Sequence, residues 1–211
     1  YGMTHVGGNV NSRLGFRGVE DLGNGLKATF NLESGFSADD GTNYMGQDGL
    51  AFTRTSTVGL AGNFGEVRLG RMLTSSYLAV SRYDAFGDTG IGGSLAWKRA
   101  YPSRAENAIS YTSPSFSGFK FGGEYGFGEK EDARTSRYIG VGAMYDNGPL
   151  SLGLGFDRIN NVGYTAANPT ALPPVAFNAG KDHTSWQLGG AYNFVVAKLL
   201  RFSKQSSEKT I

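Results

Sequence analysis

Apolar and polar residues alternate along residues 26–36, and this alternation limits the possible folds more than any other feature of the sequence. The apolar residues share one parity: Leu26, Ala28, Phe30, Leu32 and Phe36. The polar residues share the other: Lys27, Thr29, Asn31 and Glu33. A period of two predicts a β-strand with one apolar face. At about 3.3 Å per residue such a strand spans roughly 35 Å, which is enough to cross a membrane at a tilt.

The same pattern recurs in four further segments, at residues 118–127, 137–145, 150–156 and 184–194. In the third of these, the apolar parity lies opposite Ser151, Gly153 and Gly155. A face of glycine and serine suits a water-filled lumen, whereas a soluble sandwich is expected to carry more charge on its solvent side. The parity of residues 51–61 and 198–204 is ambiguous. Together the segments predict about ten strands.

The connections between these segments alternate in length. Short turns are expected at residues 21–25, 62–65, 114–118, 147–149 and 195–196. Longer links are expected at residues 37–50, 73–103, 128–136 and 160–183. Short turns alternating with long loops are typical of an up-and-down transmembrane β-barrel. The sequence therefore predicts an all-β, antiparallel up-and-down barrel that forms a single domain over residues 1–211.

The link at residues 73–103 is far longer than an ordinary connection. It also contains many apolar side chains: Tyr77, Leu78, Val80, Tyr83, Phe86, Ile91, Leu95 and Trp97. An exposed loop does not need so many apolar groups. We therefore expect this link to fold into the barrel and to pack against its wall.

Composition excludes several other classes of protein. The chain has no Cys, so it holds neither disulfides nor Cys-based metal sites. Mean hydropathy is −0.29, and no apolar run is long enough to predict a transmembrane helix. Alternating barrel strands hide their apolar residues from such averages. The net charge is only +2 and the basic residues are scattered, which argues against nucleic acid as a partner.

Targeting and catalytic patterns are also missing from the sequence. No charged segment followed by an apolar one opens the chain, so we expect a signal peptide to have been removed or the chain to be part of a longer one. His5 and His183 are isolated and fall in expected loops. No G-x-S-x-G or H-E-x-x-H motif is present. We expect no enzyme activity, no cofactor and no metal site.

Several ordered motifs carry a resemblance to a known family. They are SRLGFRGVEDLGNGLKATFNLESGF (12–36), FTRTSTVGLAGNFGEVRLGR (52–71), YDAFGDTG (83–90) and SRAENAISYTSPSFSGF (103–119). Through them the chain resembles the trimeric general porins of the Gram-negative outer membrane, especially the betaproteobacterial and neisserial type. The resemblance implies sixteen strands in the complete barrel, a homotrimer, and contacts with outer-membrane lipid and lipopolysaccharide. It also implies a chain that is incomplete at both ends, with residues 73–103 as the constriction loop.

The same motifs imply a basic side of the pore constriction. Arg13, Arg54 and Arg104 match the family's basic cluster on the barrel wall, in SRLGF, FTRTS and SRAEN. Arg13 has the parity opposite to its apolar neighbours, which independently supports an inward direction, and Arg17 shares that parity. Arg54 shares the parity of the apolar residues that follow it, so alternation alone does not place it inside. The alternative for each is an exposed charge near a strand end.

Acidic groups are expected to face this basic cluster. Asp88 matches the acidic position of the family's inward loop, and Asp84 lies near it. Glu33 has the inward parity of its strand. The alternative for both aspartates is that they bond to backbone amides in a turn. Secondary lumen charges are expected at Lys27, Arg68, Lys120 and Glu124.

Taken together, these features predict a passive channel through which small hydrophilic solutes and ions diffuse. With fewer acids than arginines at the constriction, we expect a preference for anions. Two other classes stay open. An outer-membrane barrel with an adhesive or structural role would have no open channel, and a soluble β-sandwich would have shorter strands.

Overall fold

The computed structural model describes residues 12–38, 40–43, 50–85, 103–128, 137–160, 181–194 and 197–210. The strands within these ranges are β1 (Arg13–Gly23), β2 (Leu26–Gly35), β3 (Thr55–Gly62), β4 (Gly65–Leu73), β5 (Arg104–Thr112), β6 (Phe119–Gly126), β7 (Tyr138–Asn147), β8 (Leu150–Ile159), β9 (Lys181–Phe194) and β10 (Ala197–Thr210). Two short helical elements follow β4 directly, the α-helix α1 (Ser75–Val80) and the 3-10 helix η1 (Ser81–Tyr83).

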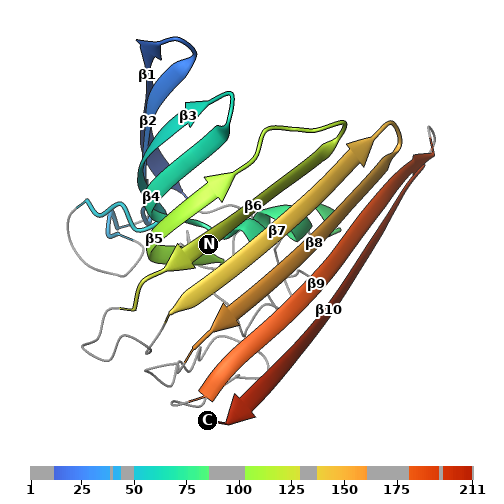
Figure 1. Cartoon of the computed structure of the whole chain (residues 1–211). Coiled ribbons are helices and arrows are strands. Elements are labelled where there is room, and N and C mark those ends of the chain that lie inside the picture. Colours follow the sequence, from blue (N-terminus) through green and yellow to red (C-terminus); the bar gives the residue numbers. More distant parts are fainter. Residues whose placement is uncertain are drawn as a thin grey trace.

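The strands form one antiparallel sheet in which each strand pairs with the next along the chain, from β1 to β10. Figure 1 shows an open, curved sheet with β1 and β10 at its two edges. The predicted all-β, antiparallel up-and-down fold with about ten strands is therefore confirmed over the described residues. None of the helices in this part of the chain is both long enough and apolar enough to span a membrane.

The register of the strands keeps their apolar side chains on one face of the sheet. One cross-strand row runs from β2 to β7 through Phe30, Val58, Leu69, Ile109, Tyr125 and Ile139. These side chains do not pack into a core, and Val58, for example, is 59% exposed. A slip of one residue would turn a whole strand's apolar set to the other side. Alternation and register together thus create one continuous surface, the apolar face.

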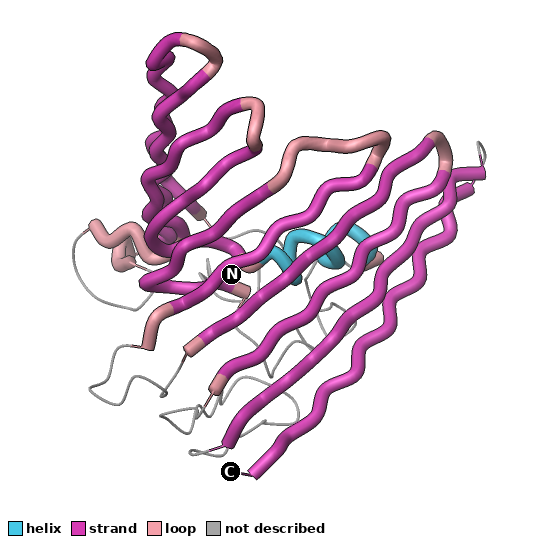
Figure 2. The backbone as a smooth tube through the Cα atoms, in the orientation of Figure 1, coloured by secondary structure: helices cyan, strands magenta, loops and turns pink. Residues whose placement is uncertain are grey.

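The opposite surface, the glycine face, carries a group of glycines beneath α1 and η1. Its small residues lie side by side on β6 to β9 and are Gly122, Gly142, Gly153, Gly155 and Gly189. Figure 2 shows α1 lying against one side of the sheet, and it packs on these four strands. A Cβ atom on Gly142 would lie 2.1 Å from the carbonyl oxygen of Ser75, and one on Gly153 would lie 2.0 Å from that of Ala79. The close approach of α1 therefore requires glycine.

The largest departure from the sequence prediction concerns β9 and β10. Because β9 begins at Lys181, the link predicted at residues 160–183 ends earlier, and His183 is a buried strand residue with 4% exposure, not a loop residue. The pairing of β9 with β10 continues to Thr210, through a polar stretch that carries little alternation. Backbone hydrogen bonds to the neighbouring strand hold this stretch as a strand. The predicted turn at residues 195–196 lies outside the described residues.

Replacing Gly153 by Ala should destabilise the protein by about 1–3 kcal/mol, because the added methyl group would collide with backbone atoms of α1. Urea unfolding of the wild type and of the variant in detergent micelles measures the difference in their free energies of unfolding. Gly190→Ala is the matched control on β9, since its Cβ would meet only Leu152 Cδ2, at 3.2 Å, and the carbonyl oxygen of Ser151, at 3.7 Å. Equal losses in the two variants would contradict the packing of α1 on Gly153.

Candidate functional site

Buried carboxylates hold the first turn of α1 on the glycine face. Both oxygens of Glu124, on β6, accept hydrogen bonds from the backbone N–H of Ser75, at 3.0 and 2.9 Å, and the Ser75 hydroxyl donates to the same carboxylate. Asp157, on β8, accepts a hydrogen bond from Ser76 Oγ at 2.5 Å. Glu124 and Asp157 are 5% and 1% exposed. The start of α1 is thus fixed by charge-assisted hydrogen bonds, which are stronger than neutral ones.

Asp157 also connects α1 to the neighbouring strands. Besides Ser76, the hydroxyl of Tyr138 on β7 and the side-chain amide of Gln187 on β9 donate to its carboxylate, the latter at 3.2 Å. Gln187 is 2% exposed and Tyr138 is 4% exposed. A buried acceptor surrounded by donors keeps a single arrangement, because rotating any member would leave a buried polar group unpaired.

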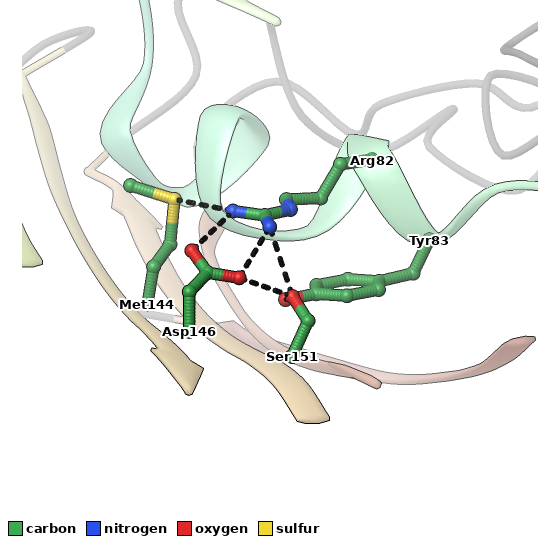
Figure 3. Close-up of polar contacts among 5 residues, drawn as sticks. All are labelled: Arg82, Tyr83, Met144, Asp146 and Ser151. Atoms are coloured by element: carbon green, nitrogen blue, oxygen red, sulfur yellow. Dashed lines mark hydrogen bonds and ion pairs between the residues drawn. The ribbon is translucent and has the colours of Figure 1, made fainter. Parts of the chain in front are cut away.

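A second set of contacts, shown in Figure 3, holds η1 to the ends of β7 and β8 that meet at their short turn. Arg82 donates two hydrogen bonds to Asp146, Nη1 to Oδ2 at 2.9 Å and Nη2 to Oδ1 at 2.5 Å. Arg82 Nη2 also donates to Ser151 Oγ at 2.9 Å, and the Ser151 hydroxyl bonds to Asp146 at 2.6 Å and to the Tyr83 hydroxyl at 2.7 Å.

The protonation states of Arg82 and Tyr83 suit these contacts. The hydrogen bond to Asp146 raises the pKa of the Arg82 guanidinium, so that group keeps its charge. Burial raises the pKa of the Tyr83 phenol, so it stays neutral at physiological pH. Figure 3 shows the Arg82 guanidinium beside the Tyr83 ring, and its carbon lies 5.4 Å from the ring centroid. That distance is within cation–π range.

Three arginines form a separate group where β2 to β5 meet, which we name the arginine cluster: Arg54, Arg71 and Arg104. Arg54 lies in a bend just before β3, and its guanidinium pairs with the Glu33 carboxylate. Arg104 Nε donates to the carbonyl oxygen of Arg54 at 2.6 Å, and Arg71 Nε donates to that of Thr53 at 2.6 Å. The two backbone carbonyls thus hold like charges close together.

Two glutamates partly neutralise the arginine cluster. Glu33 lies on β2 beside Arg54, and Glu106 on β5 accepts a hydrogen bond from Arg71 Nη1 at 2.5 Å. Arg104 interacts electrostatically with both other arginines as well as with Glu33. Three guanidinium groups against two carboxylates leave a net positive charge.

Three of the residues predicted for the constriction lie together, since Glu33 and Arg104 both contact Arg54. Arg13 and Arg17 are exposed on β1. They share the parity of Gly15, which pairs with Glu33, so both lie on the same side of the sheet as the Glu33 carboxylate.

The predicted acids of the long link are less completely placed. Asp84 directly follows η1, and its backbone N–H donates to the carbonyl oxygen of Ser81 at 3.2 Å. Asp88 lies outside the described residues. Among the expected secondary lumen charges, Arg68 forms an ion pair with Glu66 on the same strand, with 3.7 Å between Nε and Oε2. A role for any of these residues in a pore stays a prediction.

Sequence reasoning missed Arg71, Arg82 and Asp146. Arg71 shares the parity of the apolar residues Val67 and Leu69 on β4, so alternation did not select it as a pore residue. Arg82 lies in the long link, where no period was expected. Asp146 was recoverable, since it continues the even parity of residues 138–144, whose small members lie on the glycine face.

Within the described ranges, no three His, Cys, Asp or Glu side chains lie close enough together to hold a metal ion.

Comparison with known proteins gives consistent matches. The family model described as Gram-negative porin matches residues 2–203. Outer membrane porin protein 32 of Delftia acidovorans is 43% identical over 221 residues, which cover 99% of this chain and 58% of that protein. An outer membrane porin protein of Bordetella pertussis is 35% identical over 205 residues, covering 89% and 50%.

Among solved structures, an anion-selective porin from Comamonas acidovorans has a TM-score of 0.77 at 41% identity, over 96% of this chain and 59% of that one. The chain spans a little over half the length of this structure and of the Delftia protein, and half that of the Bordetella protein.

Replacing Asp157 by Asn should destabilise the protein by about 1–3 kcal/mol, because the new NH₂ group would face the donors of Ser76, Tyr138 or Gln187. Glu106→Gln is the control, since it also neutralises an acid but in an exposed ion pair with 63% side-chain exposure, where a change within about 0.5 kcal/mol is expected. Thermal unfolding in micelles measures both. A loss no larger for Asp157→Asn than for the control would contradict the buried network.

Proposed function

The chain belongs to the Gram-negative porin family, and from this premise we propose that the protein forms a water-filled channel across the outer membrane. Small hydrophilic solutes and ions diffuse through it without energy coupling. The observation that carries this proposal is the segment α1–η1, held against the glycine face by Glu124, Asp157 and Asp146. A segment fixed on the inner wall narrows a lumen without closing it.

The two faces of the sheet fit this placement. The apolar face turns to lipid, where exposed side chains such as Phe30 and Val58 are favourable. The glycine face turns to the lumen, together with α1 and the residues that anchor it. We propose residues 73–103 as the constriction loop of this lumen, with Asp84 and Asp88 contributing acidic groups to it.

Ion selection comes from the arginine cluster together with Arg13 and Arg17. Rings of charged side chains select ions in channels. The net positive charge left by Arg54 and Arg104 against Glu33 attracts anions and repels cations, while the ion pair of Arg71 with Glu106 is neutral and adds nothing to it. We therefore propose a preference for anions.

The assembly and surroundings follow from the same family. We propose a homotrimer in contact with outer-membrane lipid and lipopolysaccharide, in which each complete subunit is a closed barrel. A closed barrel leaves no backbone edge unpaired in the membrane, whereas β1 and β10 are edges in the described sheet. The proposed activity is transport by diffusion, with no catalytic step.

The full-length protein, reconstituted in a planar bilayer, should produce stepwise open channels, and its reversal potential in a KCl gradient should show anion preference. Absence of conductance would instead support an adhesive or structural barrel. A preference for cations would contradict the role of the arginine cluster.

Replacing Arg13 and Arg104 by Ser should lower the chloride-to-potassium permeability ratio about two-fold for each charge removed. The same reversal-potential measurement applies. Arg158→Ser is the matched control, because Arg158 pairs with Ile139 in the register and so lies on the apolar face. No shift in the double variant, or an equal shift in the control, would show that these arginines do not act on permeating ions.

A further inference from the structure

Arg82 and Asp146 are two charged groups on the glycine face that lie outside the arginine cluster. Both side chains are partly exposed, at 40% and 49%, on the face we assign to the lumen. Yet they form a bidentate pair with each other, so neither presents a free charge to passing ions. The fields of two opposite charges in direct contact largely cancel at distances well beyond their separation.

The pair is fixed by its surroundings. Ser151 bonds to Arg82, Asp146 and Tyr83, and it comes from the strand next to the one that carries Asp146. Figure 3 shows these four side chains converging, with Met144 on the far side of the guanidinium, where Arg82 Nη1 lies 3.9 Å from the sulfur. A planar guanidinium that is hydrogen-bonded to a carboxylate and a hydroxyl and lies beside an aromatic ring has a defined orientation.

The position of the pair also completes the attachment of the inner segment. Glu124 and Asp157 hold the first turn of α1, whereas Arg82 and Tyr83 hold the far end of η1, close to the short turn that joins β7 to β8. Tyr83 is 2% exposed and lies directly over Gly189. The segment is therefore attached to the wall at both ends.

We propose that Arg82 and Asp146 form a charge-neutral latch, a positioning pair that holds η1 on the channel wall and keeps two opposite charges out of ion selection. This inference rests on the proposed diffusion channel. It assigns to two residues outside the arginine cluster a mutual neutralisation that leaves the anion preference to the unpaired positive charge of the lumen.

Breaking the latch from its two sides should have opposite consequences for selectivity. In Arg82→Gln the carboxylate of Asp146 is left unpaired in the lumen, so the chloride-to-potassium permeability ratio should fall about two-fold. In Asp146→Asn the guanidinium of Arg82 is left unpaired, so the ratio should rise by a similar factor. A merely structural role predicts no such reversal of sign.

The double variant Arg82→Gln/Asp146→Asn tests the effect of the two charges on selectivity separately from the attachment of η1 to the sheet. With both charges removed, the permeability ratio should return to the wild-type value. The latch is still broken, so η1 moves more freely and the noise of the open-channel current should exceed that of the wild type. Arg82→Lys keeps the charge but loses the bidentate contact, and it should keep the wild-type permeability ratio.

The experiment measures reversal potentials and open-channel noise of the full-length protein in planar bilayers under a KCl gradient. The matched control is Arg158 with Asp182, an ion pair at 2.8 Å that lies on the apolar face, between β8 and β9. Neutralising either member of the control pair should leave the reversal potential unchanged.

The outcomes distinguish this inference from the function on which it rests. If the wild type forms no channels, the proposed function fails and the latch with it. If the wild type conducts but Arg82→Gln and Asp146→Asn shift the ratio in the same direction, or not at all, only the latch is overturned. Single variants that fail to assemble while the double variant assembles would support mutual neutralisation. Failure of all variants, including Arg82→Lys, would overturn it, because a latch on an inner segment is not needed to build the wall.

Discussion

A strand inside a lipid bilayer has no water to satisfy its backbone, so each N–H and C=O group must bond to a neighbouring strand. The rest of this structure depends on that constraint. The unbroken succession of pairings from β1 to β10 meets it between neighbouring strands. Once the register is set by these hydrogen bonds, the alternation of the sequence places Phe30, Val58 and Leu69 in one row.

The same register creates the surface that carries the functional site. It aligns Gly142, Gly155 and Gln187 across three strands, so that backbone atoms of α1 can approach the sheet closely. The carboxylates that hold the helix, Glu124 and Asp157, lie on the same face for the same reason. The fold and the site therefore both depend on strand pairing, because a one-residue shift of register would move the anchoring carboxylates to the apolar face.

The sequence predicted the parts of the molecule in which side chains follow a period. Strands β2 and β8 were predicted near their observed bounds, Leu26–Gly35 and Leu150–Ile159, because apolar residues alternate over residues 26–32 and 150–156. Arg54 could not be placed in this way. The period stops at the bend before β3, and its contact with Glu33 depends on backbone geometry that alternation does not encode.

Contacts between segments far apart in the sequence were the other feature that could not be predicted. The packing of α1 and η1 against the sheet agrees with the apolar content of the link, but nothing in the local sequence indicates that Arg82 meets Asp146, a residue 64 positions away. Polar residues in such contacts follow no period in the sequence. Their contacts can be identified only from a structure that contains both the sheet and the helical segment. Even so, the parity of Asp146 and Ser151 already indicated which face they occupy.

The central claim is that one face of the sheet meets lipid and the other meets water. Residues 1–211 contain no native Cys, so single cysteines along β2 report on this directly once any Cys in the rest of the full-length protein is replaced by Ser. Cysteine at Thr29, Asn31 or Glu33 of the full-length protein in outer-membrane vesicles should react with a membrane-impermeant thiol reagent. Cysteine at Phe30 or Leu32 should be protected. Reactivity without a period of two, or with the opposite parity, would contradict the account.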